Sequence, residues 1–197
     1  MRDIGAERRG STCIECEDWL PYLRVARAPF IMAGVATRLV HELKYGGWRE
    51  AAEEMGEAMA AEHLPAAVAA EIAAVLPVPL SRTRLRERGF NQAELLAAVV
   101  SRSRGWPLAT DLLIRRRHTA RQASLAGGAR TANVTMAFAV EDAARDIRDA
   151  HLLLVDDVLT TAATAQDCVR ALCSAGARAV SVLTFARARP ELPRADV

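Results

Sequence analysis

The chain has 197 residues, of which 51% are apolar and 25% are charged, so it is long enough to bury one sizeable core. No stretch approaches the roughly 20 consecutive apolar residues of a membrane-spanning helix, and the charged residues 1–9 lack the apolar run of a signal peptide. These features exclude a membrane span and a disulfide-stapled secreted scaffold. They predict a globular protein located in the cytoplasm.

The formal net charge of +2 is unevenly distributed along the chain. Residues 78–133 contain eleven arginines and three acidic residues, a local charge of +8, which leaves −6 for the remainder. Such a basic middle favours an anionic ligand, either a small phosphate-rich molecule or a nucleic acid.

The first third of the chain predicts an irregular start and two helices. Residues 1–30 carry two cysteines, two prolines and scattered charges, and we expect irregular structure there. Residues 33–45 place apolar side chains on one helical face, and Gly46 and Gly47 end that helix. A second helix is expected over residues 48–63.

The basic middle predicts one buried strand followed by a loop and a helix. An apolar run over residues 72–79 ends in Pro-Val-Pro, which is typical of a strand that proline stops. An arginine-rich loop is expected over residues 81–89. A helix should follow over residues 91–104, with Asn91 near its N-cap.

Residues 115–140 predict a mobile hairpin or loop. A short strand is expected over residues 108–114, ahead of this segment. The segment itself is basic, has strand-like ends and carries Gly127 and Gly128 at its centre. It therefore fits a surface hairpin better than core.

The last third predicts a strand–helix–strand unit. Residues 151–155 form an unbroken apolar run, which is typical of a strand buried on both faces in a parallel sheet. A helix over residues 163–175 closes at Gly176, and residues 179–185 form another buried strand. This unit predicts an α/β fold: a doubly wound, mostly parallel sheet with helices on both faces. We divide the chain into an N-terminal appendage (1–32), a main domain (33–190) and a tail (191–197).

Two carboxylates and three threonines follow the predicted strand over residues 151–155. Asp156 and Asp157 stand at its carboxyl end, where ligands of open α/β sheets bind. The helix that begins near Thr164 offers free N–H groups and a positive dipole end, which hold phosphate well. The carboxylates can accept hydrogen bonds from sugar hydroxyls or bind Mg²⁺. Phosphate at one end and vicinal hydroxyls at the other describe a ribose 5-phosphate.

The alternative is purely structural, because Asp often caps a turn and Thr often begins a helix. An Asp-Asp pair alone would favour that interpretation. The full string of apolar strand, Asp-Asp, Thr-Thr and Thr favours a binding function.

Several blocks of the chain carry a resemblance to a known family. The string Leu154-Val155-Asp156-Asp157-Val158 with Thr160-Thr161 resembles the ribose-phosphate signature of type I phosphoribosyltransferases. The chain is further similar to the ComF-like branch of that family, which includes competence protein ComF and GntX-like proteins. The blocks that carry this likeness are Leu43-Lys44-Tyr45-Gly46-Gly47, Pro77-Val78-Pro79-Leu80, Arg84-Leu85-Arg86-Glu87-Arg88-Gly89-Phe90-Asn91-Gln92-Ala93 and the spaced set Thr119, Gln122, Leu125, Arg130, Asn133, Ala137 and Phe138.

The resemblance implies that 5-phosphoribosyl-1-pyrophosphate binds together with magnesium. It makes Asp156 and Asp157 the catalytic and magnesium-binding pair. It implies a pyrophosphate loop at Ser81 and Arg82, with Arg84, Arg86 and Arg88 as further candidates. The residues expected at the ribose phosphate are Val158, Thr160, Thr161, Ala162, Ala163 and Thr164, and those expected on a closing flexible loop are Arg117, Arg121 and Arg130. The alternative for these arginines is a solvated surface or pairing with acids.

Ala162 departs from the family pattern, which has glycine at this place in the loop. Glycine matters where φ is positive or where a Cβ would meet the ligand. In either case Ala162 would weaken phosphate binding, whereas at an ordinary helical position the exchange is harmless.

Cys13 and Cys16 match half of a zinc site, and ComF-like proteins often carry an N-terminal four-cysteine zinc ribbon. The second pair of that ribbon is missing here. The ribbon is lost, or the chain starts partway through it, or another ligand such as His completes the site. Cys168 and Cys173 lie in a predicted helix and are interpreted as packing residues.

Two remaining residues have ordinary structural interpretations. Lys44 lies at a predicted helix end, where a lysine complements the helix dipole, and we adopt that interpretation. His118 is a lone histidine in a loop and is assigned no role.

Two functions remain open at this point. The chain is an enzyme that transfers phosphoribosyl to an unidentified acceptor, expected to be a nitrogen base, with release of pyrophosphate. Alternatively it is a non-catalytic phosphoribosyl- or nucleotide-binding protein, or a partner of single-stranded DNA or of the competence machinery, and either form could be oligomeric. The near absence of aromatic residues among the arginines disfavours direct binding of single-stranded DNA, which relies on stacking.

Overall fold

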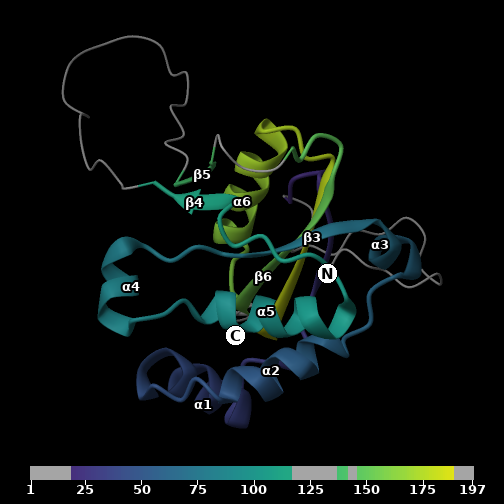
Figure 1. Ribbon diagram of the computed structural model, residues 1–197. Coiled ribbons are helices and arrows are strands. Elements are labelled where there is room, and N and C mark those ends of the chain that lie inside the picture. Colours follow the sequence, from purple (N-terminus) through teal and green to yellow (C-terminus); the bar gives the residue numbers. More distant parts are fainter. Residues whose placement is uncertain (1–18, 117–136, 142–145, 189–197) are drawn as a thin grey trace, which may run out of the picture.

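The computed structural model describes residues 19–116, 137–141 and 146–188. Its centre is a parallel sheet in the order β1 (Leu23–Arg27), β7 (Ala179–Arg187), β6 (His151–Leu159) and β3 (Ile72–Pro77), with β2 (Phe30–Ile31) also paired to β7 (Figure 1). The predicted α/β fold with a mostly parallel sheet is confirmed.

Alternate residues of β6 face two different layers of helices. Leu152 and Leu154 pack with α6 (Ala163–Ser174), whereas Leu153 and Val155 face the opposite layer. That layer consists of α1 (Gly34–His41), α2 (Ala51–Ala60) and α5 (Gln92–Arg104). An unbroken apolar run is what a strand covered on both faces requires, so the sheet is doubly wound as predicted.

Helices α2 and α5 pack closely against each other in this layer. A Cβ added at Gly56 would lie 2.5 Å from Val99 Cβ, so only glycine permits this separation of the two helices. A short π-helical segment, η2 (Glu42–Gly46), follows α1, and Gly47 ends it with a φ of 73°. A further helix, α3 (Ala66–Glu71), leads directly into β3.

The prediction of irregular structure at the start of the chain is wrong for its described part. Residues 23–31 supply β1 and β2, which pair with β7 at the edge of the sheet. Leu23, Val25 and Ala26 are buried, so packing against the sheet stabilises a segment whose local sequence gives little strand signal. Residues 1–18 and 189–197 lie outside the described residues, as do Cys13 and Cys16.

The arginine-rich loop predicted over residues 81–89 is a helix, α4 (Arg82–Arg88). Ser81 caps it by accepting a 3.3 Å hydrogen bond from the backbone N–H of Arg84, and Gly89 ends it with a φ of 76°. No residue of α4 is buried, so the sequence shows no apolar period from which a helix could be recognised.

The base of the predicted hairpin is present. β4 (Leu113–Arg115) pairs antiparallel with β5 (Phe138–Val140), while residues 117–136 between them lie outside the described residues. The strand expected from residue 108 begins only at Leu113, although Leu108 forms an isolated bridge to Val75. Among the described residues, no helix is both long and apolar enough to cross a membrane.

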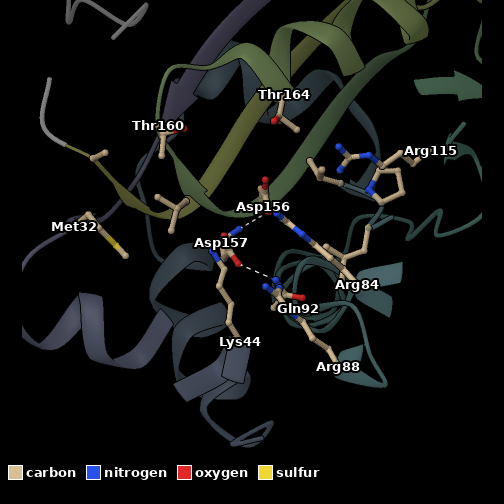
Figure 2. Close-up of a pocket in the computed structure, with 15 residues that line it drawn as sticks. Met32, Lys44, Arg84, Arg88, Gln92, Arg115, Asp156, Asp157, Thr160 and Thr164 are labelled. Atoms are coloured by element: carbon tan, nitrogen blue, oxygen red, sulfur yellow. Dashed lines mark hydrogen bonds and ion pairs between the residues drawn. The ribbon is translucent and has the colours of Figure 1, made fainter. Parts of the chain in front are cut away.

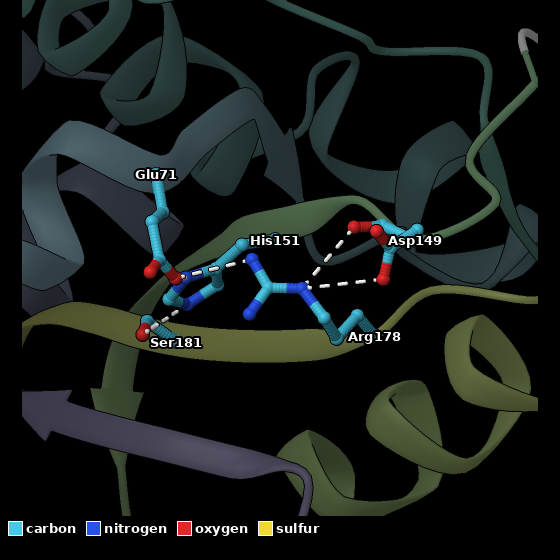
Figure 3. A network of polar contacts seen from close by, with 5 residues as sticks. All are labelled: Glu71, Asp149, His151, Arg178 and Ser181. Atoms are coloured by element: carbon cyan, nitrogen blue, oxygen red, sulfur yellow. Dashed lines mark hydrogen bonds and ion pairs between the residues drawn. The ribbon is translucent and has the colours of Figure 1, made fainter.

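A polar network around the buried His151 joins the start of β6 to β7 and to the end of α3 (Figure 3). His151 is 1% exposed, with Nδ1 3.3 Å from Glu71 Oε2 and Nε2 2.9 Å from Ser181 Oγ. Arg178 donates to the same Glu71 oxygen over 3.1 Å and thereby lowers the pKa of that carboxyl. Burial lowers the pKa of His151 below its ordinary value. A neutral ring therefore donates from Nδ1 to Glu71 and accepts the Ser181 hydroxyl at Nε2.

This network predicts that the protein loses stability as pH falls below about 6.5. The unfolded chain binds a proton at His151 more readily than the folded chain, so acid favours unfolding. Urea denaturation between pH 7.5 and pH 5.5 should show a falling free energy of unfolding. In His151→Gln this dependence on pH should be weaker, and an unchanged slope in the variant would show that His151 is not its source.

Candidate functional site

A cavity of about 350 Å³ lies beside the end of β6, beyond the point at which β3 stops pairing with it (Figure 2). Pairing between β3 and β6 ends at Pro77 and Val155, whereas β6 continues beside β7 as far as Leu159. α5, which comes after β3 and α4 in the chain, and α6, which comes after β6, cover opposite faces of the sheet. The cavity thus lies at a topological switch point, where open α/β sheets bind ligands.

Asp156 and Asp157 lie within β6, although the sequence placed them just after the strand. Because successive side chains of a strand point to opposite faces, the two carboxylates lie on opposite sides of β6, and both line the cavity. The backbone stays extended here because β7 continues to pair with it.

Asp157 is 4% exposed and both of its carboxylate oxygens have partners. Lys44 Nζ lies 2.9 Å from Oδ1, and Gln92 donates from Nε2 to Oδ2 over 3.1 Å. Gln92 is 3% exposed, and its own Oε1 has no hydrogen-bond partner. These contacts fix the position of the Asp157 side chain, which faces α5 and η2.

Asp156 has a different environment on the other side of the strand. Its Oδ1 accepts a 2.8 Å hydrogen bond from the backbone N–H of Asp157. Loss of hydration at the base of the cavity, followed by the negative charge of Asp157, raises the pKa of Asp156 to about 7.

Lys44 is a site residue that the sequence interpretation missed. We expected it to complement a helix dipole, but η2 instead directs its ammonium into the cavity and onto Asp157. The sequence feature that indicated a role for Lys44 in the site was its position in the Leu43-Lys44-Tyr45-Gly46-Gly47 block, which resembles the ComF-like proteins. The local sequence could not show the ion pair, because Asp157 lies far along the chain.

The cavity wall is rich in cations from two further elements. Arg84 and Arg88 reach it from α4, and Arg115 reaches it from β4. Together with Lys44 they outnumber the two carboxylates, so the lining has a net positive charge. Ser81 and Arg82, the residues expected at the pyrophosphate, do not line this cavity: Ser81 caps α4 and Arg82 is exposed.

The predicted phosphate loop lies beside the carboxylates. Val158, Thr160 and Thr164 line the cavity, whereas Thr161 and Ala163 are exposed to solvent and are not part of its wall. No side chain caps the N-terminus of α6, so its first N–H groups remain available to an anion.

Ala162 adopts the left-handed conformation, with a φ of 61° and a ψ of 1°, and is 3% exposed. This is the condition under which the departure from the family glycine matters. An L-residue in this region costs about 1–2 kcal/mol, so the loop keeps a glycine-like backbone at an energetic cost. Ala162 also lines a smaller space of about 40 Å³ beneath the loop.

Arg117, Arg121 and Arg130 lie outside the described residues, so their predicted role in closing the site stays a prediction. Of the arginines on that segment's flanks, Arg115 lies with its guanidinium 5.2 Å from the ring centre of the buried Phe138.

The carboxylate pair fits magnesium only with help from a ligand. Among the described residues no three His, Cys, Asp or Glu side chains come together as a metal site. Mg²⁺ in proteins usually takes one or two carboxylates, and phosphate oxygens and waters supply its other ligands. Asp156 and Asp157 match that pattern.

A second cavity of about 290 Å³ adjoins the first and shares Lys44, Arg84 and Arg88 with it. Its wall adds Tyr45 and Phe90. The Arg88 guanidinium lies 4.8 Å from the Tyr45 ring centre, and Arg49 lies 4.5 Å from that of Phe90. Aromatic rings do therefore lie among the arginines, contrary to the sequence interpretation, because folding brings η2 beside α4.

The chain is similar to proteins named for competence and for DNA use. It is 34% identical over 115 residues to Competence protein F of Haemophilus influenzae, covering 58% of this chain and 50% of that protein. It is 32% identical over 152 residues to DNA utilization protein YhgH of Escherichia coli K12, covering 76% of this chain and 66% of that protein. Against Competence protein ComFC of Bacillus subtilis it is 32% identical over 111 residues, or 56% and 42% of the two chains.

Two solved structures also resemble the chain. The glutamine phosphoribosylpyrophosphate amidotransferase of B. subtilis, complexed with ADP and GMP, gives a TM-score of 0.47 at 22% identity. A structure described as the allosteric regulatory enzyme of purine biosynthesis gives 0.48 at 23% identity. The match to the amidotransferase spans 68% of this chain and 26% of that chain. The match to the regulatory enzyme spans 69% of this chain and 25% of that chain.

The chain matches no protein-family model. It spans between about half and two thirds of the length of the Haemophilus and Escherichia relatives. Its identity to these relatives shows that the chain belongs to the family of ComF-like competence and DNA-utilization proteins.

Proposed function

We propose that the cavity at the end of β6 binds 5-phosphoribosyl-1-pyrophosphate together with magnesium. The observation that carries this proposal is the combination of charges: Lys44 and three arginines surround two carboxylates beside the uncapped N-terminus of α6. A ligand with phosphate groups at both ends and hydroxyls between them matches this order of groups.

Each part of the ligand has a counterpart in the wall. The 5-phosphate would lie on residues 160–164, and the ring hydroxyls would face Asp156 and Asp157. The pyrophosphate would meet Arg84, Arg88 and Arg115, whose planar guanidinium groups bind phosphate oxygens in pairs. In this assignment Arg84 and Arg88 replace Ser81 and Arg82 as the pyrophosphate-binding residues.

The chemistry that follows is displacement at the ribose C1. A nitrogen of the acceptor forms a bond to C1, while the bond from C1 to the pyrophosphate oxygen breaks and its electron pair leaves with the pyrophosphate. Magnesium, when bound, would supply charge neutralisation on the leaving group. The side chains contribute position and charge: the arginines stabilise the leaving pyrophosphate, and the fixed Asp157 orients the sugar. The acceptor is proposed to be a nitrogen base entering past Tyr45.

Calorimetric titration of 5-phosphoribosyl-1-pyrophosphate, with and without Mg²⁺, tests the binding directly. Binding should require Mg²⁺ and should weaken at least about tenfold in Asp157→Asn, because the variant loses one negative charge at the sugar. Asp149→Asn is a matched control: Asp149 lies in the turn before β6 with a φ of 59°, which Asn tolerates. Equal affinity of all three proteins, or no binding to any, would refute the proposal.

Two substitutions at Ala162 test the phosphate loop. Ala162→Gly removes the strained Cβ and should bind the ligand at least as tightly as the parent chain. Ala162→Val places a branched side chain in the left-handed region, and the resulting distortion should weaken binding at least about tenfold. Titration of both variants, with their melting temperatures as a check of folding, gives the comparison. Parent-like binding by Ala162→Val would show that this backbone does not shape the site.

A second candidate function is binding of single-stranded DNA in competence. The names of the relatives favour it, and so does the second cavity, where Tyr45, Phe90, Arg84 and Arg88 combine stacking surfaces with positive charge. Tyr45 is 67% exposed, so its ring is available to a base.

Fluorescence anisotropy with a labelled oligothymidylate tests this second function. Affinity should fall steeply with salt, and Tyr45→Ala should weaken binding about tenfold. Tyr22 is 51% exposed and lies just before β1, so Tyr22→Ala is the matched control that should bind like the parent chain. Equal binding by the two variants would exclude this surface as the DNA site.

A further inference from the structure

We propose that Lys44 makes metal binding at the carboxylate pair conditional on an anionic ligand. Its ammonium keeps a bare divalent cation away from Asp156 and Asp157, and the phosphate groups of a ligand remove this block. The inference rests on the proposed function for the identity of that ligand. The effect of Lys44 on metal binding is inferred from the contacts of its side chain.

The first observation is the position of the ammonium. Lys44 Nζ lies 2.9 Å from Asp157 Oδ1, and the two side chains are only 22% and 6% exposed. A divalent cation on the same carboxylate would lie close to this positive charge in a place where water screens little. Two like charges at such a separation repel strongly.

The second observation is that most of the carboxylate oxygens are already engaged. Lys44 forms an ion pair with one oxygen of Asp157, and Gln92 donates a hydrogen bond to the other. The backbone N–H of Asp157 donates a hydrogen bond to one oxygen of Asp156. A bare cation would have to share these oxygens with their donors. Carboxylate oxygens have further lone pairs, so geometry permits sharing, and the charge of Lys44 is the stronger obstacle.

The third observation is that the backbone holds Lys44 in place. It lies in η2, between the fully buried Leu43 and the left-handed Gly47 that ends this segment. A π-helical turn is uncommon in proteins and often marks a functional site. Lys44 is therefore a positioned cation and not a loose surface lysine.

The other charged residues of the cavity wall also disfavour binding of a bare cation. Arg84, Arg88 and Arg115 add positive charge to the wall, so the empty site repels cations and attracts polyanions. A phosphate-bearing ligand pairs with these groups and also brings oxygens that magnesium prefers. Ligand and metal would then enter together, and free metal would not occupy the site first.

Binding of Mn²⁺ alone, with no phosphate ligand present, tests the inference. Free Mn²⁺ is followed by its electron paramagnetic resonance signal during titration of the parent chain, Lys44→Met and Lys44→Gln. Both variants should bind one Mn²⁺ at least about tenfold more tightly than the parent chain. Lys44→Gln retains a hydrogen-bond donor toward Asp157, so it keeps the test valid should Lys44→Met fold poorly.

Two controls separate charge from loosened packing. Gln92→Met removes the neutral partner of the same carboxylate and should bind Mn²⁺ no better than the parent chain. Adding Asp157→Asn to Lys44→Gln should abolish the gain. Tight Mn²⁺ binding by the parent chain, no gain in either Lys44 variant, or an equal gain in Gln92→Met would each overturn the inference. Because the assay contains no phosphate ligand, a failure of 5-phosphoribosyl-1-pyrophosphate binding is recognised separately.

Discussion

The site depends on the unequal lengths of two neighbouring strands. β3 stops pairing at Pro77, after which Val78 still donates a 2.9 Å hydrogen bond to Val155 O and Pro79 has no N–H to donate, whereas β6 continues beside β7 to Leu159. The end of β6 is therefore open on one side, and Asp156 and Asp157 stand beside a cavity instead of another strand. A buried carboxylate at such a place needs a partner, and Asp157 is paired with Lys44 of η2 and Gln92 of α5.

The central unit could be predicted because its signals are local. The unbroken apolar run of β6, the helical spacing of α6 and Gly176 after it all lie within a short stretch of sequence. The carboxylates and threonines follow in order, so the position of Asp156, Asp157, Thr160 and Thr164 beside one cavity could be predicted too. α4 could not be predicted, because all its side chains are exposed or half-exposed and leave no apolar period.

The parts of the site that the sequence did not predict are those that join distant segments. Lys44 meets Asp157, and Tyr45 meets Arg88, only after the helical layer has packed on the sheet. The same holds for β1, whose edge position is stabilised by β7 and not by its own propensity. Ala162 is an intermediate case: its departure from glycine was visible in the sequence, and only its φ of 61° showed that the departure has a cost.

The opposite orientation of the two carboxylates divides the site between the two helical layers. Asp157 is held by residues of the layer that contains α5, whereas Asp156 faces α6 and the loop before it. Substitutions in one layer thus change the direct side-chain contacts of one carboxylate, and they reach the other through the charge and backbone of its neighbour. Residues beside η2 and α4 could therefore change in the course of evolution while the carboxylate, loop and helix on the α6 side of the sheet keep their arrangement.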